Sequence, residues 1–456
     1  MSNHIPHQPH PWVRRLYALC LYVLLPIVPL YLLWRGRKQP EYRQHWAERF
    51  ACYRQPRIAP QKRRVWLHAV SLGETRATAP LVHAFFAQNT DAHIILTHTT
   101  PTGRASGQEL FAPYLQDGRM TQVYAPYDLK PLLNRFFKTF APTDVWIMET
   151  EVWPNLMAQC VQRNIPASLI NGRMSEKTLK QTLKWRALMG NAYAGFTHVC
   201  AQTEPDAQRY REIGVVDAQL TVTGNLKFDM HIPTEQVAEG ERIKGLLTDT
   251  RVIMLASSRE GEEQLWLDAI AEFERTHAQI EKVQPRIQWW IVPRHPQRFD
   301  EVEQLLRASG KNSGKKILRK SALNELNAVQ QTAELRTADI VLGDTMGEMF
   351  TYYAIADIVL MGGTWLPYGG QNFLEPMALG KITFVGQSTF NFEQISQQAV
   401  LEKILFQFDS ITQAMIFDSR RLNQHDLDVE SVHANSIANF IENACGAVDS
   451  VLGVIT

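Results

Sequence analysis

From about residue 64 onward the chain repeats one unit: a short apolar run, a polar or glycine-containing loop, and then a helical segment. The apolar runs of the first half are residues 65–70, 94–97, 145–148, 167–170, 199–201 and 220–223. Those of the second half are residues 252–256, 289–292, 340–342, 358–361 and 382–385. This alternation is typical of parallel sheets covered by helices on both faces, so the predicted fold class is α/β. Ligands of such sheets bind beyond the carboxyl ends of the strands.

The length of 456 residues exceeds what one hydrophobic core normally organises, so two domains are expected. Residues 230–250 lack an apolar run, contain Pro233 and are rich in charges, which is typical of a linker. We therefore predict two doubly wound, Rossmann-like domains, at residues 39–232 and 245–430, facing each other across a cleft. No G-x-G-x-x-G follows the first apolar run and no G-x-x-x-x-G-K-[ST] is present, which disfavours dinucleotide-dependent oxidoreductases and P-loop enzymes.

Residues 16–34 (LYALCLYVLLPIVPLYLLW) carry no charge. As a helix this segment would reach about 28 Å, which is enough to span the hydrocarbon core of a bilayer. We predict a membrane anchor over residues 12–38. Pro26 and Pro29 interrupt the helix, so a segment that lies in one leaflet is an alternative to a spanning helix.

The charges and cysteines favour a membrane-bound protein in a reducing compartment. Residues 1–64 hold 12 Lys/Arg against 2 Asp/Glu, whereas the rest of the chain holds 35 against 44. A basic end on a mildly acidic body suits an anionic membrane better than a nucleic acid. The arginines that flank the apolar segment place the body on the cytoplasmic side. The 5 cysteines show no C-x-x-C spacing, which argues against a disulfide framework and a zinc site.

Glu74 is the first candidate for catalysis. It follows the apolar run 65–70 in the sequence Ser-Leu-Gly-Glu, where a helical pattern begins. A carboxylate at this edge of the sheet could act as a general base toward an acceptor hydroxyl. It could equally be an acid that stabilises a helix start. Burial would raise the pKa of Glu74 and the helix dipole would lower it, and the sequence leaves both open.

Polar residues also follow three other runs of the first half. Glu149 and Glu151 come directly after residues 145–148, and they would point the same way if the strand continued. Arg173 and Lys227 follow the runs 167–170 and 220–223. Their positive charges could hold a phosphate or a sugar carboxylate, although a solvent-exposed lysine is the alternative for Lys227.

The second half places a cation and two glycine-rich loops after its apolar runs. Arg294 stands between Pro293 and Pro296, where its guanidinium could bind a phosphate in a bidentate manner; a surface salt bridge is the alternative. Residues 343–348 (GDTMGE) and 362–376 (GGTWLPYGGQNFLEP) follow two further runs. Glycines allow close backbone approach to a ligand, and the helix starts offer N–H groups to an anion.

In this order the motifs HAVSLGET, TTPTGR, YAPYD, METEVWPN, GNLKFD, IVPRHP, GDTMGE, GGTW and GGQNFLEP resemble the Kdo transferases of Gram-negative bacteria. The resemblance covers residues 34–392. It implies a glycosyltransferase of GT-B architecture, with an acceptor domain followed by a CMP-Kdo-binding domain. Such an enzyme moves Kdo (3-deoxy-D-manno-oct-2-ulosonic acid) from CMP-Kdo to the 6′-hydroxyl of lipid IVA, with inversion, in lipopolysaccharide biosynthesis. The resemblance further implies an inner-membrane location and neither cofactor nor metal.

Roles carry over to matching positions of this sequence. By resemblance, Glu74 is the base that activates the acceptor hydroxyl, and Glu149 and Lys227 stabilise the transition state. The residues that the resemblance assigns to CMP binding are Pro293, Arg294, Met346, Gly347, Glu348, Asn372, Phe373, Leu374 and Glu375. Gln371 stands where relatives often carry histidine, so we assign no proton transfer to that position.

Two other functions fit the same sequence. The first is a membrane-associated GT-B enzyme that uses a UDP-sugar, from which only the loop motifs separate this chain. The second is a catalytically inactive scaffold that binds lipid A, since a fold alone does not guarantee activity.

Overall fold

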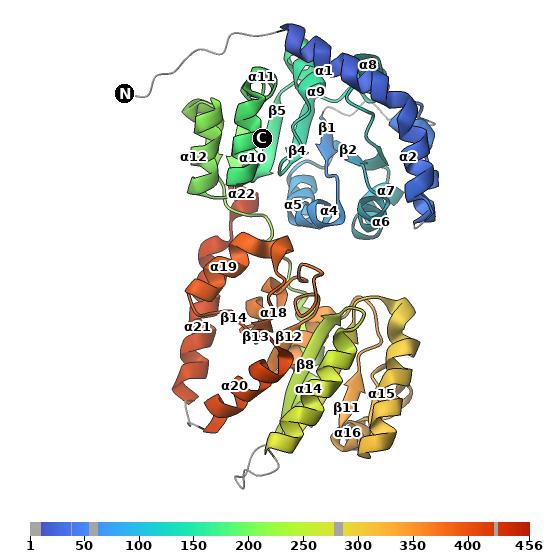
Figure 1. Ribbon diagram of the computed structural model, residues 1–456, viewed down its shortest axis with the longest axis vertical. Coiled ribbons are helices and arrows are strands. Elements are labelled where there is room, and N and C mark those ends of the chain that lie inside the picture. The colour runs from blue at the N-terminus through green and yellow to red at the C-terminus, as the bar shows by residue number, and fades with distance from the viewer. Residues whose placement is uncertain (1–10, 38, 54–62, 278–285, 424–426) are drawn as a thin grey trace. The chain divides into compact units, whose positions relative to one another are not determined.

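The computed structural model describes residues 11–37, 39–53, 63–277, 286–423 and 427–456 (Figure 1). Part of the basic segment and the end of the predicted anchor, Lys38, lie outside the described residues. The chain forms two compact units. Unit 1 comprises Met1–Met230 and Ala444–Thr456, and unit 2 comprises His231–Asn443.

Unit 1 is built on a parallel sheet of seven strands in the order β3-β2-β1-β4-β5-β6-β7. The strands are β1 (Arg64–His68), β2 (His93–His98), β3 (Met120–Tyr124), β4 (Asp144–Met148), β5 (Ala167–Gly172), β6 (His198–Ala201) and β7 (Leu220–Val222). The helices between them are α4 (Leu72–Ala77), α5 (Ala79–Gln88), α6 (Pro101–Leu110), α7 (Ala112–Gln116), α8 (Lys130–Phe140), α9 (Pro154–Arg163), α10 (Glu176–Lys184), α11 (Arg186–Ala194) and α12 (Glu204–Ile213).

Unit 2 has the same plan, with the strand order β10-β11-β9-β8-β12-β13-β14. Its strands are β8 (Thr250–Ser258), β9 (Arg286–Pro293), β10 (Ile317–Arg319), β11 (Ile340–Leu342), β12 (Ile358–Met361), β13 (Ile382–Val385) and β14 (Phe406–Gln407). Its helices are α13 (Thr234–Leu246), α14 (Glu262–His277), α15 (Phe299–Ser313), α16 (Ala328–Thr337), α17 (Met349–Ile355), α18 (Leu374–Ala378), α19 (Glu393–Leu401), α20 (Ile411–Asn423) and α21 (Leu427–Ala444). The predicted pair of doubly wound sheets is confirmed.

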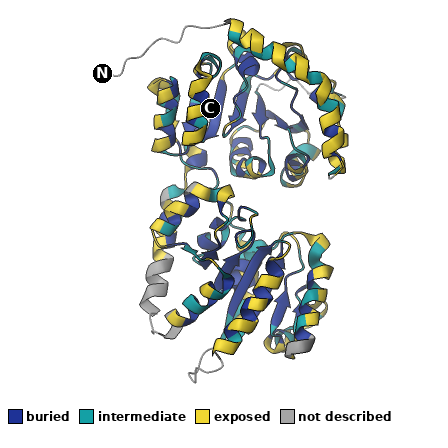
Figure 2. Ribbon diagram, in the orientation of Figure 1, coloured by how far each residue is buried: buried dark blue, intermediate teal, exposed yellow. Residues whose placement is uncertain are grey.

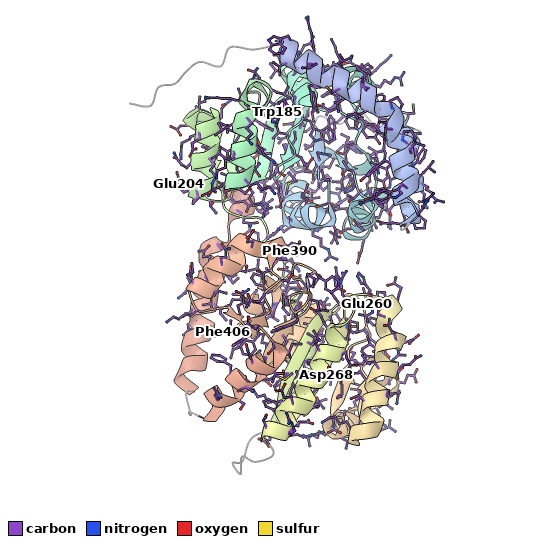
Figure 3. All side chains as sticks on the ribbon, viewed as in Figure 1. Trp185, Glu204, Glu260, Asp268, Phe390 and Phe406 are labelled. Carbon is purple, nitrogen blue, oxygen red and sulfur yellow. The ribbon has the colours of Figure 1, made fainter. Side chains whose placement is uncertain are left out.

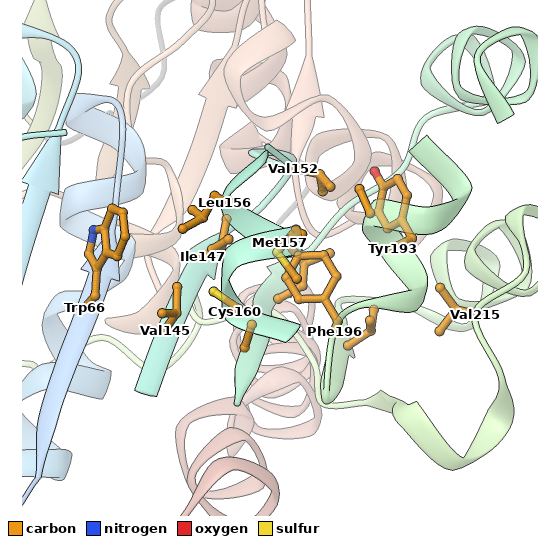
Figure 4. Packing of buried hydrophobic residues seen from close by; sticks show 14 of the residues in the cluster. Trp66, Val145, Ile147, Val152, Leu156, Met157, Cys160, Tyr193, Phe196 and Val215 are labelled. Carbon is orange, nitrogen blue, oxygen red and sulfur yellow. The ribbon is translucent and has the colours of Figure 1, made fainter. Parts of the chain in front are cut away.

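The core of unit 1 lies on both faces of its sheet. Trp66 packs on one face with Val145 and Ile147, whereas its neighbours Val65 and Leu67 pack on the other (Figure 4). All are at most 1% exposed, and the strands of the sheet are coloured mostly as buried in Figure 2. Strands buried on both faces are apolar throughout, which explains why short continuous runs, rather than alternating patterns, marked them in the sequence.

Three strands and one segment of the structure differ from the sequence predictions. The missed strands β3, β10 and β14 each end the strand order of a sheet. Residues 230–250, expected to be a linker, mostly form α13, which packs against α17 inside unit 2. The expectation failed because a polar helix that buries little apolar surface has the composition of a linker.

The last helix, α22 (Ala447–Ile455), returns to unit 1. Val451 and Leu452 are buried among residues of β1 and β2. The Asp229 carboxylate accepts from the backbone N–H groups of Gly446 (2.7 Å) and Val448, and so caps the start of α22. This carboxylate therefore fastens the end of the chain beside the loop that follows β7.

The N-terminal apolar segment is helical, with a 3-10 turn at Leu25–Ile27 between α1 (Pro11–Leu24) and α2 (Val28–Arg35). The predicted interruption at Pro26 is thus observed. Residues Trp12–Arg35 are long and apolar enough to cross a membrane, and 6% of their apolar window is buried. One face packs on unit 1, where Leu21 and Leu25 contact a small cluster around Leu129. The segment also exposes large apolar side chains, among them Leu19, Val23 and Leu30, and much of its ribbon is coloured as exposed in Figure 2.

Candidate active site

Glu74 is the third residue of α4 and is hydrogen-bonded to the start of its own helix. Ser71 caps α4 by accepting from the N–H of Glu74 (3.3 Å). In return the Glu74 carboxylate accepts from the N–H of Val70 (2.8 Å) and the hydroxyl of Ser71 (3.0 Å). The interpretation of Glu74 as a helix-start acid therefore holds, and it fixes the direction of the side chain.

The same carboxylate has a pKa suited to a base. Burial raises the pKa of Glu74 to about 7, against the opposing hydrogen bonds from Val70 and Ser71. The negative charges of Glu149 and Glu151 contribute to the same rise in pKa. The effect of burial on the pKa of Glu74 is therefore larger than the opposing effect of the helix start, a balance that the sequence left open. A carboxyl with a pKa near neutrality can take up a proton at physiological pH.

Glu149 does not continue strand β4. Its φ of 51° is in the left-handed region, and its N–H donates to the carbonyl of Ile170 (2.9 Å). The strand ends at Met148, so the condition under which Glu149 and Glu151 would point the same way is not met. Glu151 instead accepts from the indole N–H of Trp153 (3.1 Å), and burial raises its pKa. A non-glycine residue in this region costs about 1–3 kcal/mol, a strain that is common at functional sites.

Lys227 lies opposite Glu149, with 3.9 Å between its Nζ and Glu149 Oε1. Its loop follows β7 and is held by the N–H of Leu226, which donates to the side chain of Asn171 (3.1 Å). Asn171 belongs to β5 and also has a positive φ, 54°. The structure thus brings the predicted catalytic residues Glu74, Glu149 and Lys227 to one edge of the unit 1 sheet. Arg173, also predicted there, is half-buried and close enough to Tyr210 for its charge to affect that phenol.

Asp128 connects this edge to the N-terminal helix. Its buried carboxylate accepts from the N–H groups of Asn155 (3.0 Å) and Leu156 (2.8 Å), which begin α9. Trp153 occupies the N-cap of α9 and makes no capping hydrogen bond, so Asp128 supplies the cap from another loop. The Tyr17 hydroxyl in α1 donates to the same carboxylate (3.1 Å). Helix α1 and the start of α9 are therefore both hydrogen-bonded to Asp128.

Replacing Tyr17 with phenylalanine should loosen this docking. The ring is retained and one hydrogen bond to a buried carboxylate is lost, which costs about 1.5–3 kcal/mol. We expect faster amide hydrogen exchange in α1 and at the start of α9, measured by mass spectrometry on the full chain. Tyr22→Phe is the control, because Tyr22 lies on the same helix and is 46% exposed. Equal exchange in the two variants would contradict the proposed link.

In unit 2 the glycine-rich loop after β12 is held by a carboxylate that the sequence analysis did not single out. Glu262 begins α14 and is fully buried. It accepts from the N–H groups of Gly363 (2.7 Å), Trp365 (3.0 Å) and Arg259 (2.9 Å). An acid at a helix start directly after Gly261 was the available signal. Glu262 gives the loop one conformation by satisfying N–H groups that have no strand partner.

Two positions of this loop, Gly362 and Gly363, are unfavourable for any residue other than glycine. A Cβ on Gly362 would lie 2.4 Å from the carbonyl oxygen of Ser257, and Gly363 has a φ of 73°. Ser257 itself has a φ of 57°. The N–H of Gly370 closes the loop by donating to Gly363 (2.7 Å). Backbone is thus brought close to backbone at the carboxyl ends of β8 and β12.

Most predicted CMP residues lie at this end of the unit 2 sheet. The N–H of Arg294 donates to Ser258 (3.0 Å), directly after β9, and its half-buried side chain is close enough to Tyr353 for its charge to affect that phenol. Glu375 accepts from the amide of Asn372 (3.0 Å) and also bonds Tyr353. Arg294, Asn372 and Glu375 therefore form one cluster around Tyr353, a residue that the sequence analysis did not single out.

The remaining predicted CMP residues differ in exposure. The side chains of Pro293, Phe373 and Leu374 are buried, so only their backbone could reach a ligand. Met346 is 55% exposed, and nothing lies within 4 Å of a Cβ placed on Gly347. Glu348 accepts from the Lys320 ammonium and from the hydroxyl of Thr345 (2.7 Å). The carboxylate is thus partly neutralised beside an open turn.

Known proteins are similar to this chain in sequence and in fold. A family model described as 3-deoxy-D-manno-octulosonic-acid transferase (kdotransferase) matches residues 44–230. A 3-deoxy-D-manno-octulosonic acid transferase of Bordetella pertussis is 38% identical over 85% of this chain and 86% of its own. Two solved structures are similar in fold. The UDP-GlcNAc 2-epimerase of Neisseria meningitidis has a TM-score of 0.53 at 16% identity, over 86% of this chain and 99% of its own. A glycosyltransferase of Rickettsia africae has a TM-score of 0.52 at 12% identity, over 86% and 98%.

Proposed function

The chain belongs to the 3-deoxy-D-manno-octulosonic acid (Kdo) transferase family, and from that premise we propose that it transfers Kdo from CMP-Kdo to the 6′-hydroxyl of lipid IVA. The transfer proceeds with inversion and without a metal ion, as a step of lipopolysaccharide biosynthesis. The observation that carries this proposal is the Glu74 carboxyl, whose pKa burial raises to about 7 beside Glu149 and Lys227. The GT-B architecture of the chain, with two Rossmann-like units, also supports a glycosyltransferase.

In the proposed reaction unit 1 supplies the base and unit 2 binds the donor. Glu74 takes the proton of the acceptor hydroxyl while that oxygen bonds to the anomeric carbon of Kdo. The bond from this carbon to the phosphate oxygen of CMP breaks, and CMP leaves with the electron pair. The transition state resembles an oxocarbenium ion, which the negative charge of Glu149 stabilises. Lys227 stabilises the negative charge that develops on the departing phosphate.

Donor binding is assigned to the loops after β9, β11 and β12. Arg294 pairs with the phosphate of CMP, because a guanidinium beside a buried strand end can donate two parallel hydrogen bonds. Asn372 and Glu375 offer an amide and a carboxylate to the ribose or the base. The glycine loop that Glu262 holds lets backbone approach the nucleotide.

Arg294→Lys should weaken CMP binding about tenfold, since a lysine keeps the charge and loses the planar pair of donors. Isothermal titration calorimetry with CMP measures the effect. Arg307→Lys on α15 is the matched control, because Arg307 pairs with Glu303 on the surface of its own helix. An unchanged affinity in Arg294→Lys would remove Arg294 from the donor site.

The N-terminal helix supports association with the inner membrane, with the body on the cytoplasmic side. Tyr17 and Leu21 hold one face of α1 on unit 1, while Leu16, Leu19 and Val23 are 52–65% exposed on the rest of its surface. A helix that packs along a folded unit and exposes apolar side chains suits the interface of one leaflet. The alternative of a helix that lies in one leaflet is therefore the one we propose.

The deciding experiment supplies the purified full chain with CMP-Kdo and lipid IVA, and measures CMP release together with the mass of the lipid. A gain in mass with release of CMP supports the transferase, and the size of the gain counts the Kdo residues added. The same assay with EDTA tests the metal-free mechanism. Reaction only with a UDP-sugar would overturn the donor assignment, and lipid binding without CMP release would favour a scaffold.

A further inference from the structure

The junction between α10 and α11 carries an exposed tryptophan. Trp185 is 66% exposed and Leu183 is 37% exposed. The backbone of Trp185 is fixed, because its N–H donates to Gln181 (3.3 Å) and its carbonyl accepts from Leu188 (2.9 Å). The residue therefore lies between the two helices, as the C-cap of α10 and the N-cap of α11, and its indole is exposed on the surface of unit 1 (Figure 3).

Cations surround this indole. Lys177, Lys180 and Lys184 are spaced so that they lie on one face of α10, and Arg186 begins α11. All four side chains are exposed. Glu176 is the one acid in the sequence from 174 to 202, on a chain that is acidic overall beyond residue 64. The residues Lys177, Lys180, Lys184, Trp185 and Arg186 are called the α10–α11 patch below.

The patch is connected to the N-terminal helix through α11, the helix that Arg186 begins. Helix α11 packs against α1, and α9 contacts both. Val161 on α9 is 57% exposed and adds apolar surface there. A bilayer that receives the exposed face of α1 would thus lie near the helix pair that carries an exposed indole and four cations.

The chemistry of the patch selects its partner. Tryptophan favours the headgroup level of a membrane, where its ring is apolar and its N–H can donate. Each Lys or Arg near an anionic lipid surface strengthens binding about fivefold. A nucleic acid would require a larger basic surface than one helix junction provides. The alternative, a helix face that is charged only because it is in contact with water, does not explain why a large indole is exposed among the cations.

We propose that the α10–α11 patch is a second membrane contact, which binds the anionic headgroups of phospholipids beside α1. This inference rests on the proposed membrane association of α1. The two contacts differ in chemistry, since α1 offers apolar surface to any bilayer and the patch offers charge to an anionic one. Together they give unit 1 a defined orientation on the membrane.

The test compares binding of the full chain to neutral phosphatidylcholine vesicles and to vesicles with phosphatidylglycerol, by co-sedimentation at low salt. The double variant Lys180→Gln/Lys184→Gln should bind the anionic vesicles about 20- to 30-fold more weakly and the neutral vesicles unchanged. Arg307→Gln/Lys316→Gln in unit 2 is the control, since it alters net charge equally. Quenching of tryptophan fluorescence by brominated lipid should fall in Trp185→Phe.

Each outcome decides between the two contacts. If the native chain binds neither kind of vesicle, the proposed membrane association fails and this inference fails with it. If it binds neutral vesicles and gains nothing from anionic lipid, the patch alone is excluded. An equal loss in the control pair would mean that net charge, and not the patch, governs binding, and would also overturn the inference.

Discussion

Replacing Glu74 with glutamine should lower kcat by about 10²–10⁴-fold, because the acceptor hydroxyl then has no base to receive its proton. Glutamine can keep the local hydrogen bonds. Its carbonyl can accept from the N–H of Val70, and its amide can donate to Ser71, two contacts that Glu74 makes at 2.8 and 3.0 Å. Affinity for CMP should stay the same. Initial rates of CMP release with lipid IVA measure the loss, and Glu109→Gln on the exposed side of α6 is the control.

The pH dependence gives an independent signature of the same residue. With a pKa of about 7, Glu74 is protonated and inactive as a base below neutrality, so kcat/KM should rise with pH through about 7. Glutamine should abolish this rise. A full-rate Glu74→Gln enzyme, or a native profile without the rise, would assign the base to another group.

Whereas kcat/KM should rise with pH, the contribution of Glu74 to the stability of the folded protein should fall as the pH rises. The pKa of Glu74 is raised on folding, so the folded state holds this proton more tightly than the unfolded state between about pH 4.5 and 7. The contribution of Glu74 to stability is therefore lost as the pH rises through that window. At pH 8 Glu74→Gln should be at least as stable as the native protein, measured by thermal unfolding. A less stable variant would mean that the carboxylate serves the structure more than the reaction.

The sequence predicted those parts of the fold that burial alone specifies. Central strands such as β1 and β8 are apolar on both faces and were identified from short runs of residues. The strands that were missed, β3, β10 and β14, lie at sheet edges, where fewer neighbours constrain the residues. The loops that follow the strands held the candidate residues, because parallel strands deliver them to one edge.

Two features of the site depend on backbone conformation, which the sequence did not disclose. Glu149 adopts a φ of 51°, so it does not continue the strand that would have pointed Glu149 and Glu151 the same way. Glu262 accepts hydrogen bonds from three N–H groups in two loops. This role cannot be recognised without knowing that β8 and β12 are neighbours in the sheet. An acid at this position indicates the start of a helix, and in the folded protein Glu262 also holds the glycine-rich loop after β12.

Replacing Glu262 should disrupt the glycine-rich loop that follows β12. Glu262→Ala leaves the N–H groups of Gly363, Trp365 and Arg259 without their acceptor, at about 1–3 kcal/mol for each buried donor. We expect the loop to lose its single conformation and CMP affinity to fall by about tenfold or more. Calorimetry with CMP and hydrogen exchange over residues 360–376 measure the two effects.

Glu262→Gln separates geometry from charge. An amide has one acceptor oxygen where the carboxylate uses both, so at least one N–H must lose its partner and the loss in affinity should lie between those of the native chain and the alanine variant. Glu260→Gln, two residues earlier with an exposed side chain, is the control. Faster exchange with unchanged CMP affinity would mean that the glycine loop is ordered by Glu262 and yet does not contact the nucleotide, and the donor site would then shift toward Arg294 and Glu375.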